Sequence, residues 1–190
     1  LKPSEEACLT ALAIGQLANE AGFPEGSINI VPGLGEKAGS SLIKHPDINH
    51  ISFTGSVEIG KKVQTEAAKN LIPVTLELGG KSPQIVFEDA NLEKALPFLI
   101  NAGIQNAGQT CSASSRILVS KKIYAELIDK MSKLYCKLKV AQAIDDKDLG
   151  PVISSRQREI ITNYLKLSKD LECISEGKFE MNLPEKGYYV

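Results

Sequence analysis

The 190-residue sequence has almost no net charge and no long apolar run, and each of these shortages excludes a class of protein. The 22 basic residues nearly balance the 23 acidic ones, so no general electrostatic attraction to nucleic acid is expected. No apolar segment approaches the roughly 20 residues that cross a bilayer, and no signal peptide is visible. We therefore expect neither nucleic acid nor a membrane as a partner.

Thiols and imidazoles are also scarce. The four cysteines are widely separated and never form a Cys-x-x-Cys pair, so neither structural zinc nor a disulfide framework is predicted. No metal ligand is assigned, and a reducing cytoplasm is the expected location. The only histidines, His45 and His50, lie far from Cys111 in the sequence. A start at Leu1 without Met and an abrupt end at Val190 are typical of a fragment excised from a longer protein.

Segments rich in strand formers alternate with segments of helical spacing, which predicts an α/β fold with a mainly parallel sheet. Strands are expected in residues 27–33, 50–55, 71–80, 82–90 and 114–122. Helices are expected in residues 4–22, 35–45, 56–70, 91–109, 121–140 and 153–170, the first capped by Ser4.

Two segments suit a phosphate-bearing ligand, and each has a plainer alternative. The segment GLGEKA, residues 33–38, fits the G-x-G-x-x-G/A dinucleotide pattern, but it fits a simple glycine-rich turn as well. In FTGSVEIGKK a strand ends at Gly55 and a helix opens at Ser56. The Ser56 hydroxyl and the free N–H groups would bind phosphate, or the hydroxyl would only cap the helix.

Two further residues carry reactive groups whose roles the local sequence leaves open. Glu77 lies in the apolar run LELGGK, where burial would raise its pKa toward the range of a general base; an outward-facing position on an edge strand is the alternative. Cys111 lies in NAGQTCSASS, which contains no charged residue. The thiol is either a nucleophile in a cleft or a small buried apolar group.

Taken together, these segments resemble the aldehyde dehydrogenase superfamily. The matching pieces occur in family order and cover the chain to about residue 160: KPSE, PGLGEKAG, FTGSVEIGKKV, LELGGKSPQIVFEDANLEKA, NAGQTCSASSRILV and LGPVIS. The combination of LELGGKSP and GQTC is highly specific. The resemblance implies part of a Rossmann-like NAD-binding domain over residues 1–78 and part of the thiol-bearing catalytic domain over residues 79–190.

The resemblance also assigns roles to single residues. It implies that Cys111 is the catalytic thiol and Glu77 the general base. The pyrophosphate would lie on the helix that opens at Gly55 and Ser56, and the GLGEKA segment would only pack near the adenine. The other implied cofactor contacts are Lys2 and Glu5 at the adenosine ribose, Ile59, Gly35 and Gly39 around the adenine, and Leu78. Because Glu5 would repel a 2′-phosphate, NAD is implied over NADP.

The implied reaction is oxidation of a small or polar aldehyde to a carboxylic acid through a cysteine thiohemiacetal and thioester. Glu77 favours hydrolysis of the thioester, since relatives that pass it to coenzyme A usually lack this residue. An upstream Asn and a downstream Glu of the family are missing, so we expect this chain alone to be inactive. The resemblance also implies that the parent is a homodimer or homotetramer. A non-catalytic structural homologue of the same fold is the alternative, and a Cys-His hydrolase is a more distant one.

Overall fold

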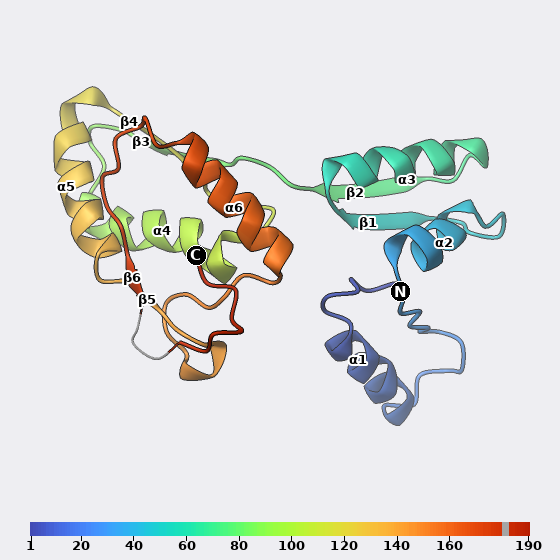
Figure 1. Ribbon diagram of the computed structural model, residues 1–190. Coiled ribbons are helices and arrows are strands. Elements are labelled where there is room, and N and C mark those ends of the chain that lie inside the picture. Colours follow the sequence, from blue (N-terminus) through green and yellow to red (C-terminus); the bar gives the residue numbers. More distant parts are fainter. Residues whose placement is uncertain (180–182) are drawn as a thin grey trace. The chain divides into compact units, whose positions relative to one another are not determined.

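The computed structural model describes residues 1–179 and 183–190, which divide into two compact units, residues 1–78 and 79–190 (Figure 1). The first unit contains α1 (Leu9–Glu20), a π-helical turn (Gly35–Gly39), α2 (Ser40–Lys44), β1 (Ile51–Gly55), α3 (Val57–Lys69) and β2 (Val74–Leu78). The second contains β3 (Pro83–Val86), α4 (Leu92–Ile104), β4 (Arg116–Val119), α5 (Tyr124–Tyr135), β5 (Lys139–Val140), α6 (Ser155–Leu167), β6 (Lys178–Phe179) and three 3₁₀ turns (Gln105–Gly108, Lys121–Ile123 and Ala143–Asp145).

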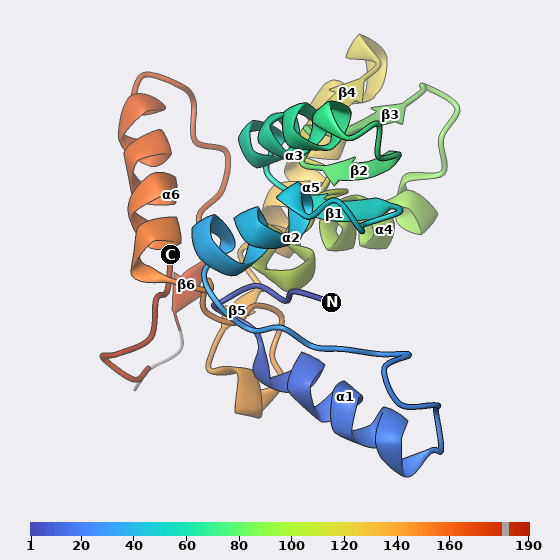
Figure 2. The ribbon, with the colours of Figure 1, turned by 90° about the vertical axis from the view of Figure 1, so that its right-hand side faces the viewer.

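The first unit is built on a β–α–β motif. Strands β1 and β2 pair in parallel, with Ile51 opposite Val74 and Gly55 opposite Leu78, and α3 connects them and packs on both (Figure 2). Gly60 allows this close approach, because a Cβ atom there would lie 2.7 Å from Cδ2 of Leu78. The parallel pairing and α3 agree with the α/β fold expected from the sequence.

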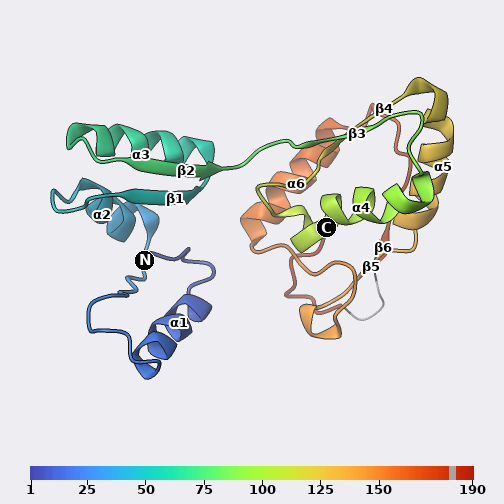
Figure 3. The same ribbon diagram turned by 180° about the vertical axis from the view of Figure 1, so that it is seen from behind.

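The second unit repeats the motif with β3, α4 and β4. The two strands pair in parallel with Pro83 opposite Arg116, and α5 packs against α4 (Figure 3). A third parallel pair, β5 with β6, is two residues long. The core beneath these elements is aliphatic and consists of Val86, Leu92, Leu96, Leu99, Ile100, Leu127 and Met131.

Leu127 is the most deeply buried large side chain of this core, with 1% of its surface exposed. Leu127→Ala is therefore expected to lower the free energy of unfolding by about 2–5 kcal/mol, because it removes buried methyl groups and leaves a cavity. Urea denaturation followed by circular dichroism measures the loss. Leu167→Ala is the matched control, since that side chain is 79% exposed and should change stability by less than about 0.5 kcal/mol. Equal losses in the two variants would contradict this account of the core.

Two expectations about the first unit are wrong. Residues 27–33 form no strand: among the described residues, the backbone hydrogen bonds that join them to another segment are made with Leu1 alone, whose carbonyl accepts from the Val31 N–H at 2.9 Å. The first helix begins at Leu9, and Ser4 does not cap it. Ser4 instead closes a tight turn, in which its carbonyl accepts from the Ala7 N–H at 3.2 Å and its hydroxyl from the Glu6 N–H at 3.3 Å.

Within residues 1–179 and 183–190, no helix has the length and apolar character needed to cross a membrane. The same residues contain no group of three or more His, Cys, Asp or Glu side chains arranged to hold a metal ion.

Candidate active site

The loop that carries Cys111 begins with an abrupt change of backbone direction after α4. Asn106, Ala107 and Gly108 follow one another in the left-handed region, with φ angles of 52°, 54° and 73°. Glycine adopts this conformation freely and asparagine tolerates it, whereas alanine rarely does, so the turn is a strained local structure. Helix α4 ends at Ile104, and the turn that follows leads the chain to Cys111, whose side chain is exposed.

Contacts on two sides hold the thiol loop, residues 105–115. On one side, the Ser114 N–H donates to the Ala102 carbonyl of α4 at 2.9 Å. On the other, Gly80 lies so near that a Cβ atom there would be 3.6 Å from the Cys111 carbonyl oxygen. Nε of Arg116, directly after the loop, donates to the Lys81 carbonyl at 2.9 Å. These contacts attach the thiol loop to α4 and to residues 80–81.

Two polar groups beside the thiol have no partner among the described residues. The backbone N–H of Cys111 donates no hydrogen bond, and Oγ1 of Thr110 is buried without one. An exposed thiol next to a free N–H is the arrangement that a nucleophile and its oxyanion donor require. The loop is therefore chemically suited to covalent attack on a carbonyl.

Glu77 lies in the first unit, on β2 opposite Thr54 of β1. Side chains alternate along β2, so that Leu76 and Leu78 are partly buried while Glu77 is exposed. Glu77 therefore faces outward in this unit, which was the alternative to burial that the sequence allowed. Its side chain is accessible to water. Glu77 and Cys111 belong to different units, so the contacts of each residue are described within its own unit.

Several residues expected to contact the adenosine lie together. The Nζ atom of Lys2 donates to the Gly33 carbonyl at 2.9 Å and pairs with the Glu5 carboxylate at 3.4 Å. A Cβ atom on Gly39 would touch the Lys2 side chain at 3.4 Å. The backbone N–H of Glu5, then Lys2 and then the N–H of Gly35 lower the pKa of the Glu5 carboxyl, so it stays ionised at neutral pH.

The groups of this cluster suit the ribose of a dinucleotide. An ammonium beside a carboxylate supplies both a donor and an acceptor for a ribose diol. The long helix α3 begins just after Ser56, whose hydroxyl accepts from the Ile59 N–H at 3.3 Å, and the start of such a helix favours an anion. Ser56 is thus shown to be a cap, and capping does not prevent the helix start from binding phosphate.

Gly55 and Leu78 end the two paired strands of the first unit. A Cβ atom on Gly55 would lie 2.6 Å from the Phe53 ring, so any larger residue would displace that ring. Ile59, in the first turn of α3, has 41% of its surface exposed, as a residue that packs on a flat ring requires.

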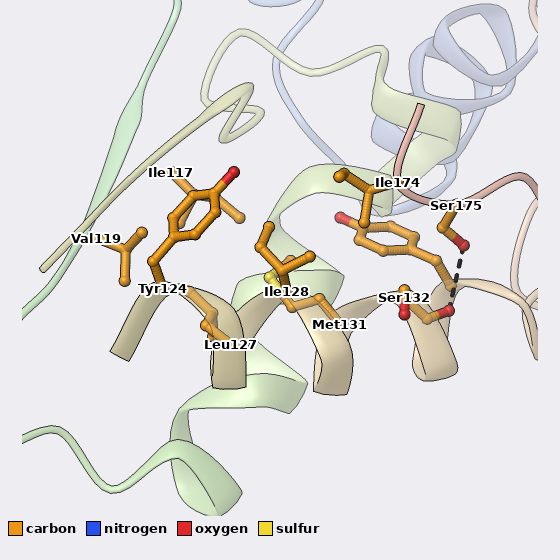
Figure 4. A pocket seen from close by; sticks show the side chains of 10 residues that line it. Ile117, Val119, Tyr124, Leu127, Ile128, Met131, Ser132, Ile174 and Ser175 are labelled. Atoms are coloured by element: carbon orange, nitrogen blue, oxygen red, sulfur yellow. Dashed lines mark hydrogen bonds between the residues drawn. The ribbon is translucent and has the colours of Figure 1, made fainter. Parts of the chain in front are cut away.

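A cavity of about 320 Å³ lies elsewhere in the second unit, against α5 and the segment around Ser175 (Figure 4). The Ser175 hydroxyl donates to the Ser132 carbonyl at 3.2 Å at its edge, and burial raises the pKa of the Tyr135 phenol. Cys111 is not among the lining residues, so the cavity is separate from the thiol loop. Its lining is mostly apolar: Ile117, Val119, Tyr124, Leu127, Ile128, Met131, Ser132, Tyr135, Ile174 and Ser175.

Gly80 and Gln109 support the thiol loop, although the sequence motifs predict no role for either residue. Gly80 makes room for the Cys111 carbonyl, and the Gln109 side chain bonds to residue 153. Both lie inside the matching segments LELGGKSP and GQTC. Their position inside these motifs was the one sign in the sequence that the two residues have a role. Their contacts depend on the tertiary fold and could not be read from the motifs.

The chain matches the model of the Aldehyde dehydrogenase family over residues 1–190 and belongs to this family. It is 43% identical to betaine aldehyde dehydrogenase, chloroplastic, from Atriplex hortensis and 42% identical to aminoaldehyde dehydrogenase 1, peroxisomal, from Pisum sativum. Each alignment covers 100% of this chain and 38% of the relative. The NAD⁺ complex of an aldehyde dehydrogenase from Bacillus cereus is 39% identical, with a TM-score of 0.92 over 100% of this chain and 39% of that one. The chain thus spans about 38% of the length of these curated relatives.

Proposed function

We propose that the complete enzyme carrying this sequence oxidises an aldehyde to a carboxylic acid with NAD, using Cys111 as nucleophile and Glu77 as general base. The observation that carries the proposal is the exposed Cys111 thiol on a loop anchored to α4 and to residues 80–81, in a chain of the aldehyde dehydrogenase family. The first unit is proposed to belong to the cofactor-binding domain and the second to the catalytic domain.

The residues of the chain account for the two stages of this reaction. The Cys111 thiolate adds to the aldehyde carbonyl and forms a thiohemiacetal, whose oxyanion the Cys111 N–H stabilises. The bound nicotinamide supplies the two-electron acceptor, and loss of a hydride converts the thiohemiacetal into a thioester. Glu77 then takes a proton from a water molecule that attacks the thioester carbonyl. The acid leaves, and the sulfur of Cys111 is released for the next turnover.

NAD is proposed as the cofactor because Glu5 is ionised and stands beside Lys2. Lys2 and Glu5 would hold the adenosine ribose, Gly35, Gly39 and Ile59 would surround the adenine, and Gly55, Ser56 and Leu78 would border the pyrophosphate and nicotinamide side. The related Bacillus cereus structure contains NAD⁺, which agrees with this choice.

Glu5→Gln is expected to weaken the preference for NAD over NADP by about tenfold or more, because it removes a negative charge that repels the 2′-phosphate. Steady-state assays of the complete enzyme with both cofactors measure the ratio of kcat/KM. Since the pKa of Glu5 is lowered, the wild-type preference should persist as the pH falls from neutral and weaken only when this carboxyl takes up a proton. Glu6→Gln is the matched control, and an equal change in that variant would contradict the role of Glu5.

The experiment that tests the function is an assay of NADH formation by the complete enzyme with a panel of aldehydes. Betaine aldehyde and an aminoaldehyde come first, because the related plant enzymes carry those names, and acetaldehyde represents small neutral substrates. We expect turnover of at least one of them with NAD. No turnover of any aldehyde would favour the non-catalytic homologue. A dimeric or tetrameric state and a cytoplasmic location remain predictions, which light scattering and fractionation can test.

A further inference from the structure

Gln109, two residues before Cys111, bonds in two directions through its side-chain amide. Its Nε2 group donates to the Asn106 carbonyl at 3.0 Å, within the thiol loop. Its Oε1 atom accepts from the backbone N–H of Ile153 at 2.9 Å. The first bond closes a local turn, whereas the second joins two segments that are 44 residues apart in the sequence.

The segment around Ile153, to which Gln109 is bonded, is itself held on both sides. Val152 is 6% exposed, and its N–H donates to the Tyr188 carbonyl at 2.9 Å. Ser154, directly after Ile153, caps α6, with its hydroxyl accepting from the Gln157 N–H at 3.2 Å. Ile153 is itself 54% exposed, but its backbone lies between the buried Val152 and the Ser154 cap of α6, so these two neighbours hold the N–H that it presents to Gln109.

The thiol loop needs such a support on this side. Its known contacts on the other sides lie at Ser114, after the thiol, and at Gly80, beside it. The left-handed turn before Cys111 is strained at Ala107, and it does not fix the loop by itself. Of the residues between that turn and Cys111, Gln109 has the side chain that reaches a distant element.

We infer that Gln109 is a positioning residue, and that its bond to Ile153 holds the Cys111 sulfur in the place from which it attacks the aldehyde. This gives a role to the LGPVIS segment, residues 149–154, which the proposed chemistry otherwise does not use. The inference rests on the proposed function. It concerns the geometry of the thiol, since Gln109 need not touch substrate or cofactor.

The test breaks the bond from each end in the complete enzyme. Gln109→Leu removes the acceptor at nearly constant volume, and Ile153→Pro removes the N–H donor. Both variants should lower kcat at least about tenfold while leaving the KM for NAD within about twofold, because a small misplacement of a nucleophile is costly to the reaction. The double variant should be no slower than Gln109→Leu alone, since Ile153→Pro removes only a bond that Gln109→Leu has already removed. Gln84→Leu is the matched control, as it removes a 2.9 Å bond between β3 and the Leu99 carbonyl of α4 that includes no residue of the thiol loop.

A second measurement does not depend on turnover. Alkylation of Cys111 by iodoacetamide, followed by peptide mass spectrometry with exposed Cys173 as internal reference, should change in the same direction in both single variants, by at least about threefold in each. If the wild-type enzyme oxidises no aldehyde, the proposed function fails and the alkylation rates alone judge the inference.

Three outcomes overturn the inference. The first is a kcat that falls by less than tenfold in either single variant, or an alkylation rate of Cys111 that stays unchanged. Another is a double variant whose loss is the product of the two single losses. The third is a variant that no longer folds by circular dichroism, because the bond would then serve folding rather than the position of the thiol.

Discussion

Cys111→Ala is expected to abolish aldehyde oxidation by the complete enzyme, with kcat lowered at least about 10⁴-fold. The substitution removes the sulfur that forms the thiohemiacetal, and residues 105–115 contain no second thiol to replace it. Because the cofactor contacts proposed above lie in the first unit, NAD should still bind with unchanged affinity. Initial rates of NADH formation and calorimetric titration with NAD measure the two quantities.

The matched control is Cys173→Ala, which removes another exposed thiol of the second unit. Its kcat should equal that of the wild type within about twofold, as for most surface substitutions away from a site. Continued turnover by Cys111→Ala within tenfold of the wild type would refute the assignment of the nucleophile. Loss of NAD binding in that variant would show that the change had damaged more than the thiol.

Glu77→Gln should separate the two stages of the reaction. Hydride loss from the thiohemiacetal does not require Glu77, whereas hydrolysis of the thioester does, so steady-state kcat should fall about 10²–10⁴-fold. Rapid mixing should still show a burst of about one NADH per Cys111, because the thioester forms and then accumulates. Added hydroxylamine attacks thioesters without help from a protein base, and it should restore part of the turnover.

Glu88→Gln controls for the loss of a carboxylate, since Glu88 forms an exposed ion pair with Lys122 at 2.8 Å and should be dispensable. A Glu77→Gln variant that has no burst and no turnover would place Glu77 before thioester formation. Unchanged turnover would remove it from the mechanism. Mass spectrometry of the protein trapped during turnover identifies the acylated residue directly.

Much of the fold could be predicted from local sequence. The sequence FTGS contains both a strand end and a capping serine, so the start of α3 was correctly predicted. The prediction of a strand at residues 27–33 was wrong, because the formation of a strand depends on more than local sequence. An apolar run becomes a strand only when another strand is available to pair with it, and the described part of this chain supplies only residue 1 there.

The candidate site was harder to predict than the fold. The residue types at positions 77 and 111, with the motifs around them, predicted a base and a thiol. The family is shown, and the roles of these two residues stay predictions. The exposure of Glu77 follows from strand alternation, which the sequence allowed but did not require. The bond from Gln109 to Ile153 joins distant parts of the chain, and no local pattern encodes such a contact.

The left-handed turn at Asn106, Ala107 and Gly108 also limits how this region can change in length during evolution. Surface loops usually accept insertions and deletions, because little depends on their register. The thiol loop is different, since Ser114 is bonded to Ala102 behind it and Gln109 to Ile153 beside it. One residue added or removed between these points would shift Cys111 against both anchors. Length variation among related sequences should therefore occur in exposed turns such as residues 143–148, and the spacing from α4 to the thiol should stay constant.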